Sequence, residues 1–159
     1  MAMSTPTGSG PGAPLPPTLV YIAGFALAMW LDRVVPLGDG VAHPAMVAVG
    51  GLLVVAGTVL FFWGLATFAR QRTGIMLQQA ATRVVDVGPY RWSRNPMYVA
   101  FTMVYAGLAL TYALLWALLL LPIVNLVLTV AVIAREERYM RATFGAAYAD
   151  YCQRVRRWL

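Results

Sequence analysis

The sequence has few charged residues. Only 11% of its 159 residues are charged, whereas 60% are hydrophobic, and the mean hydropathy is +0.69. A soluble domain carries about 25% charged residues, because polar groups must cover its surface. The composition therefore excludes an ordinary soluble domain and a disordered chain. It predicts an all-α polytopic membrane protein.

Lysine is missing altogether. All twelve basic residues are arginine, and six acidic residues leave a formal net charge of +6. A basic chain can bind nucleic acid, but these arginines lie between long apolar runs, as topology signals do. We expect membrane lipids as partners, and no nucleic acid.

Cysteine and histidine are equally scarce. Cys152 is the only cysteine, which excludes an intramolecular disulfide and a cysteine zinc site. His43 is the only histidine, so the usual metal ligand and the usual general base are missing from most of the chain. We expect no bound metal.

Residues 1–17 are rich in Pro, Gly, Ser and Thr and carry no charge, which predicts a disordered tail before a single membrane domain over residues 18–159. A helical span needs about 20 largely apolar residues. The first span is expected from Thr18 to near Pro36, and the second over residues 44–68.

Residues 95–134 form a stretch of forty residues without a charge. We expect two spans there, over residues 97–111 and 113–134, that form a hairpin with a turn near Thr111 and Tyr112. A turn at Pro122 is the alternative, because proline interrupts a helix.

The arginines are distributed unevenly over the loops. Five follow the second span, six lie in the C-terminal segment, and Arg33 alone lies between the first two spans. Because basic loops face the cytoplasm, the sequence predicts four spans with both termini in the cytoplasm.

Two polar segments lie on that predicted cytoplasmic side. Residues 84–98 contain the turn signals Gly88-Pro89 and Asn95-Pro96 and lead into the third span. A basic loop with interfacial aromatic anchors is the simpler interpretation of this segment. In the second segment, Glu136 and Glu137 follow the fourth span and lie about 100° apart on a helix.

One of these two carboxylates can face the bundle while Glu137 meets Arg141 on the outer face. A solvated helix end with local ion pairs is the alternative. Of the other polar residues, we expect Asn125 to form an interhelical hydrogen bond. We expect Trp158 and its neighbours Arg154, Arg156 and Arg157 to anchor the chain on anionic lipid.

The order of four pieces resembles a known family. They are Gly88-Pro-Tyr-Arg-Trp-Ser-Arg-Asn-Pro-Met-Tyr98, a hairpin, Glu136-Glu137-Arg138, and Phe144-Gly145-x-x-Tyr148-x-x-Tyr151. Together they resemble the isoprenylcysteine carboxyl methyltransferase family and are similar to the related membrane phospholipid methyltransferases. The likeness covers about residues 67–158.

The resemblance implies S-adenosylmethionine as the methyl donor, bound at the cytoplasmic face. The short run of residues 82–85 aligns with a stretch whose backbone contacts the cofactor, and Glu136 matches the acidic residue that holds it. A carboxylate can pair with the sulfonium and ammonium of the donor, and an arginine with its carboxylate. The expected cofactor-binding residues are Val84, Val85, Tyr90, Arg94, Asn95, Pro96, Met97, Tyr98 and Glu136.

The methyl acceptor is less defined than the donor. Val132 stands where the eukaryotic enzymes have an arginine that contacts the lipidated substrate. Without a histidine on the cytoplasmic side, the acceptor must be nucleophilic as bound, as a thiolate or carboxylate is, or lose its proton to a carboxylate or water. Glu137 is the candidate catalytic residue for that proton. We expect a lipophilic acceptor: a carboxylate, thiol or amine.

Two other functions are compatible with the same sequence. The first is an NADPH-dependent membrane reductase related to the sterol reductases, although those chains are generally longer. The second is a small membrane protein without enzymatic activity, whose arginines serve only to set its topology.

Overall fold

The computed structural model describes residues 16–71 and 84–159 of the chain. Most of the expected tail therefore lies outside the described residues, as do Thr82 and Arg83 of the run expected to contact the cofactor. The first helix begins at Pro17, the last residue of that expected tail. All named secondary-structure elements in the described part are helices, which confirms the all-α class.

The helices in chain order are α1 (Pro17–Val34), α2 (Pro44–Arg70), the 3-10 turn η1 (Gly88–Arg91), α3 (Pro96–Thr111), α4 (Leu115–Leu128), the π-helical segment η2 (Thr129–Ile133), α5 (Ala134–Phe144) and α6 (Ala146–Arg154). α4, η2 and α5 form one uninterrupted helix of 30 residues, Leu115–Phe144. This helix and α2 are both long and apolar enough to cross a membrane. α1 has 18 residues and α3 has 16.

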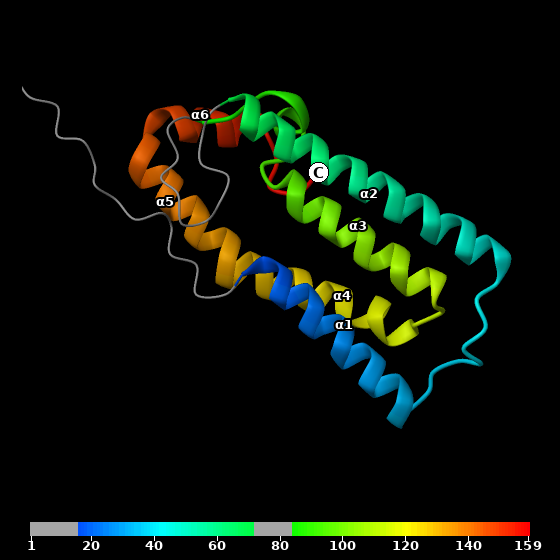
Figure 1. Ribbon diagram of the computed structural model, residues 1–159. Helices are drawn as coiled ribbons and strands as arrows, with labels where there is room; N and C mark the ends of the chain where they lie inside the picture. The colour runs from blue at the N-terminus through cyan, green and yellow to red at the C-terminus, as the bar shows by residue number, and fades with distance from the viewer. Residues whose placement is uncertain (1–15, 72–83) are drawn as a thin grey trace, which may run out of the picture.

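The helices are arranged as two antiparallel pairs, α2 against α3 and α1 against α4 (Figure 1). α1 and α3 run in one direction, and α2 and α4 run in the other (Figure 1). Because of these directions, the start of α3, the loop before it, and α5 and α6 all gather at one end of the bundle. The two polar segments of the sequence are thereby brought to the same end.

Glycines allow α2 and α3 to pack with their backbones close together. A Cβ atom added at Gly50 would lie 2.6 Å from the Gly107 carbonyl oxygen, and one at Gly57 would lie 2.8 Å from the Ala100 carbonyl oxygen. Neither position can hold a side chain without moving the backbone of α3. Small residues at helix contacts are typical of membrane bundles, since close packing replaces the hydrophobic effect there.

The turn between α3 and α4 follows Thr111, as the sequence predicts. It closes with a hydrogen bond from the Leu114 amide to the Ala109 carbonyl, and Ala113 adopts a positive φ of 50°. Pro122 lies inside α4, so the alternative turn at this proline is wrong.

The charged residues of the long C-terminal helix begin at Arg135, so its apolar part covers residues 115–134 and ends before Glu136. Gly145, with a φ of +50°, separates α5 from α6 and lets the chain fold back. Glycine adopts this left-handed conformation without the steric penalty of a side chain. Glu136 and Glu137 therefore lie beyond the apolar segment, beside the loop that precedes α3.

Candidate functional site

The loop before α3 is held in place by α2 and α6. The Tyr151 hydroxyl donates a 2.8 Å hydrogen bond to the Tyr90 carbonyl, and the Tyr90 ring meets the Phe68 ring edge-on at 4.8 Å. Val85 is buried, and Val84 packs against the tyrosines of α6. The loop is thus an ordered wall at the end of the bundle.

Tyr98, in the first turn of α3, reaches across to α5. Its hydroxyl donates a 2.7 Å hydrogen bond to Oε1 of Glu136. Tyr90 lies close enough that the Glu136 charge acts on it, and Gly64 of α2 lies beside both the Tyr90 hydroxyl and Met97. We call Tyr90, Met97, Tyr98 and Glu136, together with Gly64, the tyrosine–glutamate site.

The Tyr90 hydroxyl is buried and has no hydrogen-bond partner among the described residues. Burial raises the pKa of Tyr90, and the nearby Tyr151 and Glu136 raise it further. The hydroxyl therefore keeps its proton at all physiological pH values. A buried donor without a partner costs about 1–3 kcal/mol, so it is a position where a ligand oxygen or nitrogen would be stabilised.

Glu136 has no arginine partner in an ion pair within the described part of the chain. Burial raises the pKa of Glu136, the Tyr98 hydrogen bond lowers it, and the charge of Glu137 raises it, with a net increase. A carboxylate in such surroundings gains strongly from a cation placed next to it.

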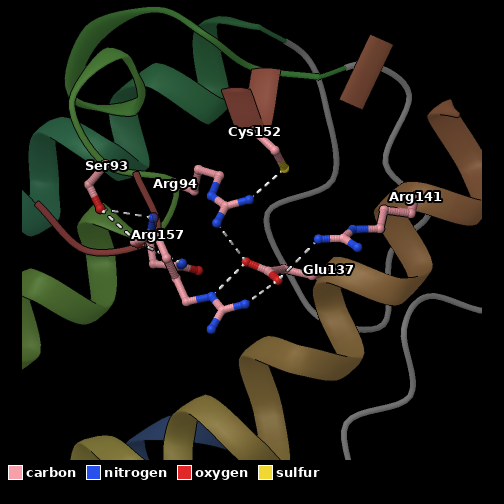
Figure 2. Close-up of polar contacts among 7 residues, drawn as sticks. Ser93, Arg94, Glu137, Arg141, Cys152 and Arg157 are labelled. Carbon is pink, nitrogen blue, oxygen red and sulfur yellow. Dashed lines mark hydrogen bonds and ion pairs between the residues drawn. The ribbon is translucent and has the colours of Figure 1, made fainter. Parts of the chain in front are cut away.

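Glu137, the next residue, has the opposite surroundings. Arg157 donates two hydrogen bonds to its carboxylate, from Nε to Oε1 at 2.9 Å and from Nη2 to Oε2 at 2.8 Å. Arg94 lies 3.3 Å from Oε1 and Arg141 lies 4.0 Å from Oε2. Figure 2 shows the three arginines converging on the one carboxylate. We call Glu137, Arg94, Arg141 and Arg157 the arginine cluster.

The electrostatic effect of these arginines on Glu137 exceeds that of burial. Burial by itself raises the pKa of the Glu137 carboxyl, but the hydrogen bonds from Arg157 and the charges of Arg94 and Arg141 lower it below its ordinary value of 4.5. Glu137 is therefore ionised at neutral pH and a weak base.

The C-terminal residues are attached to the loop by their backbone as well. The Asn95 side-chain amide donates to the Arg157 carbonyl at 2.9 Å, and the Arg94 backbone amide donates to the Arg156 carbonyl at 2.9 Å. Ser93 Oγ donates to the same Arg157 carbonyl at 3.3 Å (Figure 2). The last residues of the chain are thereby fixed against the entrance to α3.

The structure divides the predicted site residues into two groups. It brings Tyr90, Met97, Tyr98 and Glu136 together, with Pro96 buried at the start of α3. The side chains of Arg94, Asn95 and Glu137 instead hold the C-terminal segment. Asn95 and Arg94 therefore do not have the free side chains that the sequence-based interpretation gave them.

Two expectations need correction. Glu137 does not lie on the outer face with Arg141 alone, because it is buried and Arg94 and Arg157 reach it from the loop and the C terminus. Arg157 does not serve only as a lipid anchor, because its guanidinium binds Glu137. Asn125, by contrast, accepts a 3.0 Å hydrogen bond from Thr102 of α3, which confirms its predicted interhelical role.

Sequence reasoning missed two contributors to this region. Arg157 and Ser93 were not among the expected site residues, and their contacts join segments 20 and 64 residues apart. No spacing pattern indicates such contacts, because the chain reverses at Gly145 before it returns to the loop. Arg94 also donates a hydrogen bond to Cys152 Sγ, so the single cysteine belongs to the same region.

Comparison with known proteins identifies the family. The sequence model described as phospholipid methyltransferase matches residues 45–147, which are more than half of the chain. The matched range includes α2, the loop before α3, the hairpin and both glutamates. A search of curated proteins found no match. The chain therefore belongs to the phospholipid methyltransferase family, a family of methyltransferases.

Proposed function

We propose that this protein is an integral membrane methyltransferase that uses S-adenosylmethionine and acts on a lipophilic acceptor. The contrast between the two adjacent glutamates carries the proposal. Glu137 is neutralised by three arginines, whereas Glu136 has a tyrosine hydroxyl as its neighbour and a raised pKa. A site that lacks a cation beside one buried carboxylate suits a cationic ligand.

The tyrosine–glutamate site fits the chemical groups of the methyl donor. Glu136 offers a carboxylate to a sulfonium or ammonium group, and the Tyr90 hydroxyl offers a buried donor that lacks a partner among the described residues. Aromatic rings of Tyr90 and Phe68 meet beside it and supply apolar surface. When bound, S-adenosylmethionine supplies an electrophilic methyl group, so the protein needs mainly to bind and orient the reactants.

The residues of the site have separate tasks in this proposal. Glu136 attracts positive charge, Tyr98 fixes the rotamer of Glu136 through its 2.7 Å hydrogen bond, and Tyr90 orients the ligand through its hydroxyl. The attachment of the C-terminal segment by Asn95 and Glu137 closes the outer side of the loop and limits access of water. Glu137 thus acts in maintaining this closure.

We also propose that the chain has four spans with the site on the cytoplasmic face. Two helices meet the length and composition of a span, and α1 and α3 run beside them with the alternating directions of a four-span bundle (Figure 1). Eleven of the twelve arginines lie after α2 or at the C terminus, which places the end with α5 and α6 inside the cell.

The acceptor follows from the proton balance. Glu137 is paired and its pKa is lowered, so it would accept a proton from an acceptor poorly. An acceptor that binds as a thiolate or carboxylate needs no base at all. The family model is that of phospholipid methyltransferases, so a membrane lipid is the natural class of acceptor, reached sideways from the bilayer. An amine headgroup remains the acceptor that tests this reasoning most directly.

The donor is tested by ligand-induced thermal stabilisation of the purified protein in detergent. S-adenosylhomocysteine should raise the melting temperature in a concentration-dependent manner, and NADPH should not. The reductase alternative predicts the reverse, and a protein without enzymatic activity predicts no shift with either ligand. The match to a methyltransferase family gives the reductase alternative no support.

A further inference from the structure

Tyr21, on the first helix, is the residue that leads furthest beyond the site itself. It is buried, and it lies in α1, outside the residues 45–147 that match the family. Its hydroxyl lies 3.0 Å from the Tyr98 carbonyl, 2.9 Å from Thr102 Oγ1 and 3.3 Å from Asn125 Oδ1. One hydroxyl therefore joins α1 to both α3 and α4.

These contacts surround one end of Tyr98. Thr102 Oγ1 also donates to the Tyr98 carbonyl at 2.9 Å, so two hydroxyls converge on that oxygen in the first turn of α3. The other end of Tyr98 is its hydroxyl, which donates to Glu136. Tyr98 is thus held at its backbone by α1 and used at its side chain by the tyrosine–glutamate site.

We infer that Tyr21 is a positioning residue of the proposed cofactor site and acts through Tyr98; this inference rests on the proposed function. A hydrogen bond between helices in an apolar bundle fixes their relative position, because alternative partners are few. By setting the first turn of α3, Tyr21 sets the distance over which the Tyr98 hydroxyl reaches Glu136. The first helix therefore contributes to methyl-donor binding without contacting the donor.

The test compares affinities for S-adenosylhomocysteine in detergent, with Tyr105→Phe as the matched control. Tyr105 packs 6.1 Å from Tyr21, ring to ring, and its buried hydroxyl has no partner among the described residues. Tyr21→Phe should weaken binding about threefold to tenfold, the effect of one net hydrogen bond. Tyr105→Phe should bind as the wild type does.

A double mutant decides whether Tyr21 acts through Tyr98. In a Tyr98→Phe background the added change Tyr21→Phe should have no further effect on affinity, because the link to Glu136 is already lost. Should Tyr21→Phe not be recovered folded, Thr102→Val removes the hydroxyl that bonds to Tyr21 and allows the same comparison.

The outcomes separate the two proposals. A lowered melting temperature of Tyr21→Phe with unchanged affinity would show that Tyr21 only stabilises the bundle, and additive effects in the double mutant would show that it does not act through Tyr98. Either result overturns the inference and leaves the proposed function standing. A wild-type protein that does not bind S-adenosylhomocysteine overturns the proposed function, and the inference with it.

Discussion

The Glu137 carboxylate and the Arg157 guanidinium form two parallel hydrogen bonds, at 2.9 and 2.8 Å, across twenty residues of sequence. This pairing is the firmest link between the C-terminal segment and the long C-terminal helix. The backbone of Arg157 is bound in turn by Asn95, from the loop before α3. Three segments of the chain therefore meet at a single buried carboxylate.

Replacement of Arg157 by Met should destabilise the protein. Arg94 and Arg141 remain, but the bidentate pair is lost, and removing one partner of a buried ion pair costs about 3–5 kcal/mol at most. Because Arg157 is partly exposed, we expect the lower part of that range. Arg156→Met is the matched control, since the Arg156 side chain is exposed. Thermal melts in detergent that give equal values for both variants would contradict the role of Arg157.

The attachment of the C terminus should depend on pH. The pKa of Glu137 is lowered in the folded protein, so its ionised form contributes stability that is fully present above its ordinary pKa of 4.5. That stability is lost as the pH falls below 4.5 and through the lowered pKa. Limited proteolysis of the C-terminal segment should therefore accelerate only at acid pH. In Glu137→Gln, cleavage should be fast at neutral pH as well.

Replacement of Glu136 by Gln should weaken S-adenosylhomocysteine binding by about 1–3 kcal/mol, because a buried charge then no longer faces the ligand. The fold should survive, since no arginine in the described part forms an ion pair with Glu136. Isothermal titration together with the melting temperature measures both effects. Unchanged affinity would remove Glu136 from the site.

Gly50 and Gly51 form a matched pair for testing the α2–α3 contact. A Cβ at Gly50 would lie 2.5 Å from Thr111 Oγ1 and 2.6 Å from the Gly107 carbonyl, whereas a Cβ at Gly51 would meet nothing within 4 Å. Gly50→Ala should therefore lower the melting temperature, and Gly51→Ala should leave it unchanged or raise it. Equal melting temperatures of the two variants would show that the helices do not pack as closely as described.

The four-span topology predicts opposite locations for two reporter fusions. A fusion after Gly40, between α1 and α2, should report the outside, and a fusion at the C terminus should report the cytoplasm. The same location for both fusions would contradict an arrangement with the site end inside the cell.

The sequence determined the helical class and the helix limits with little error. Apolar runs interrupted by charge and turn residues predict where helices begin and end, and the helices over Pro44–Arg70 and Pro96–Thr111 agree with those predictions to within a few residues. The pattern was sufficient because each helix satisfies its own backbone hydrogen bonds, a local property of the chain. The motifs around Tyr90 and Glu136 likewise indicated the family that the match to residues 45–147 shows.

The tertiary structure decided what the individual polar residues do. Glu136 and Glu137 are neighbours in sequence, yet one faces Tyr98 and the other faces three arginines. Which carboxylate is neutralised depends on where the C-terminal segment returns after the reversal at Gly145 and on how it docks against the loop before α3. Such contacts arise from packing between distant segments, and no local spacing in the sequence encodes them.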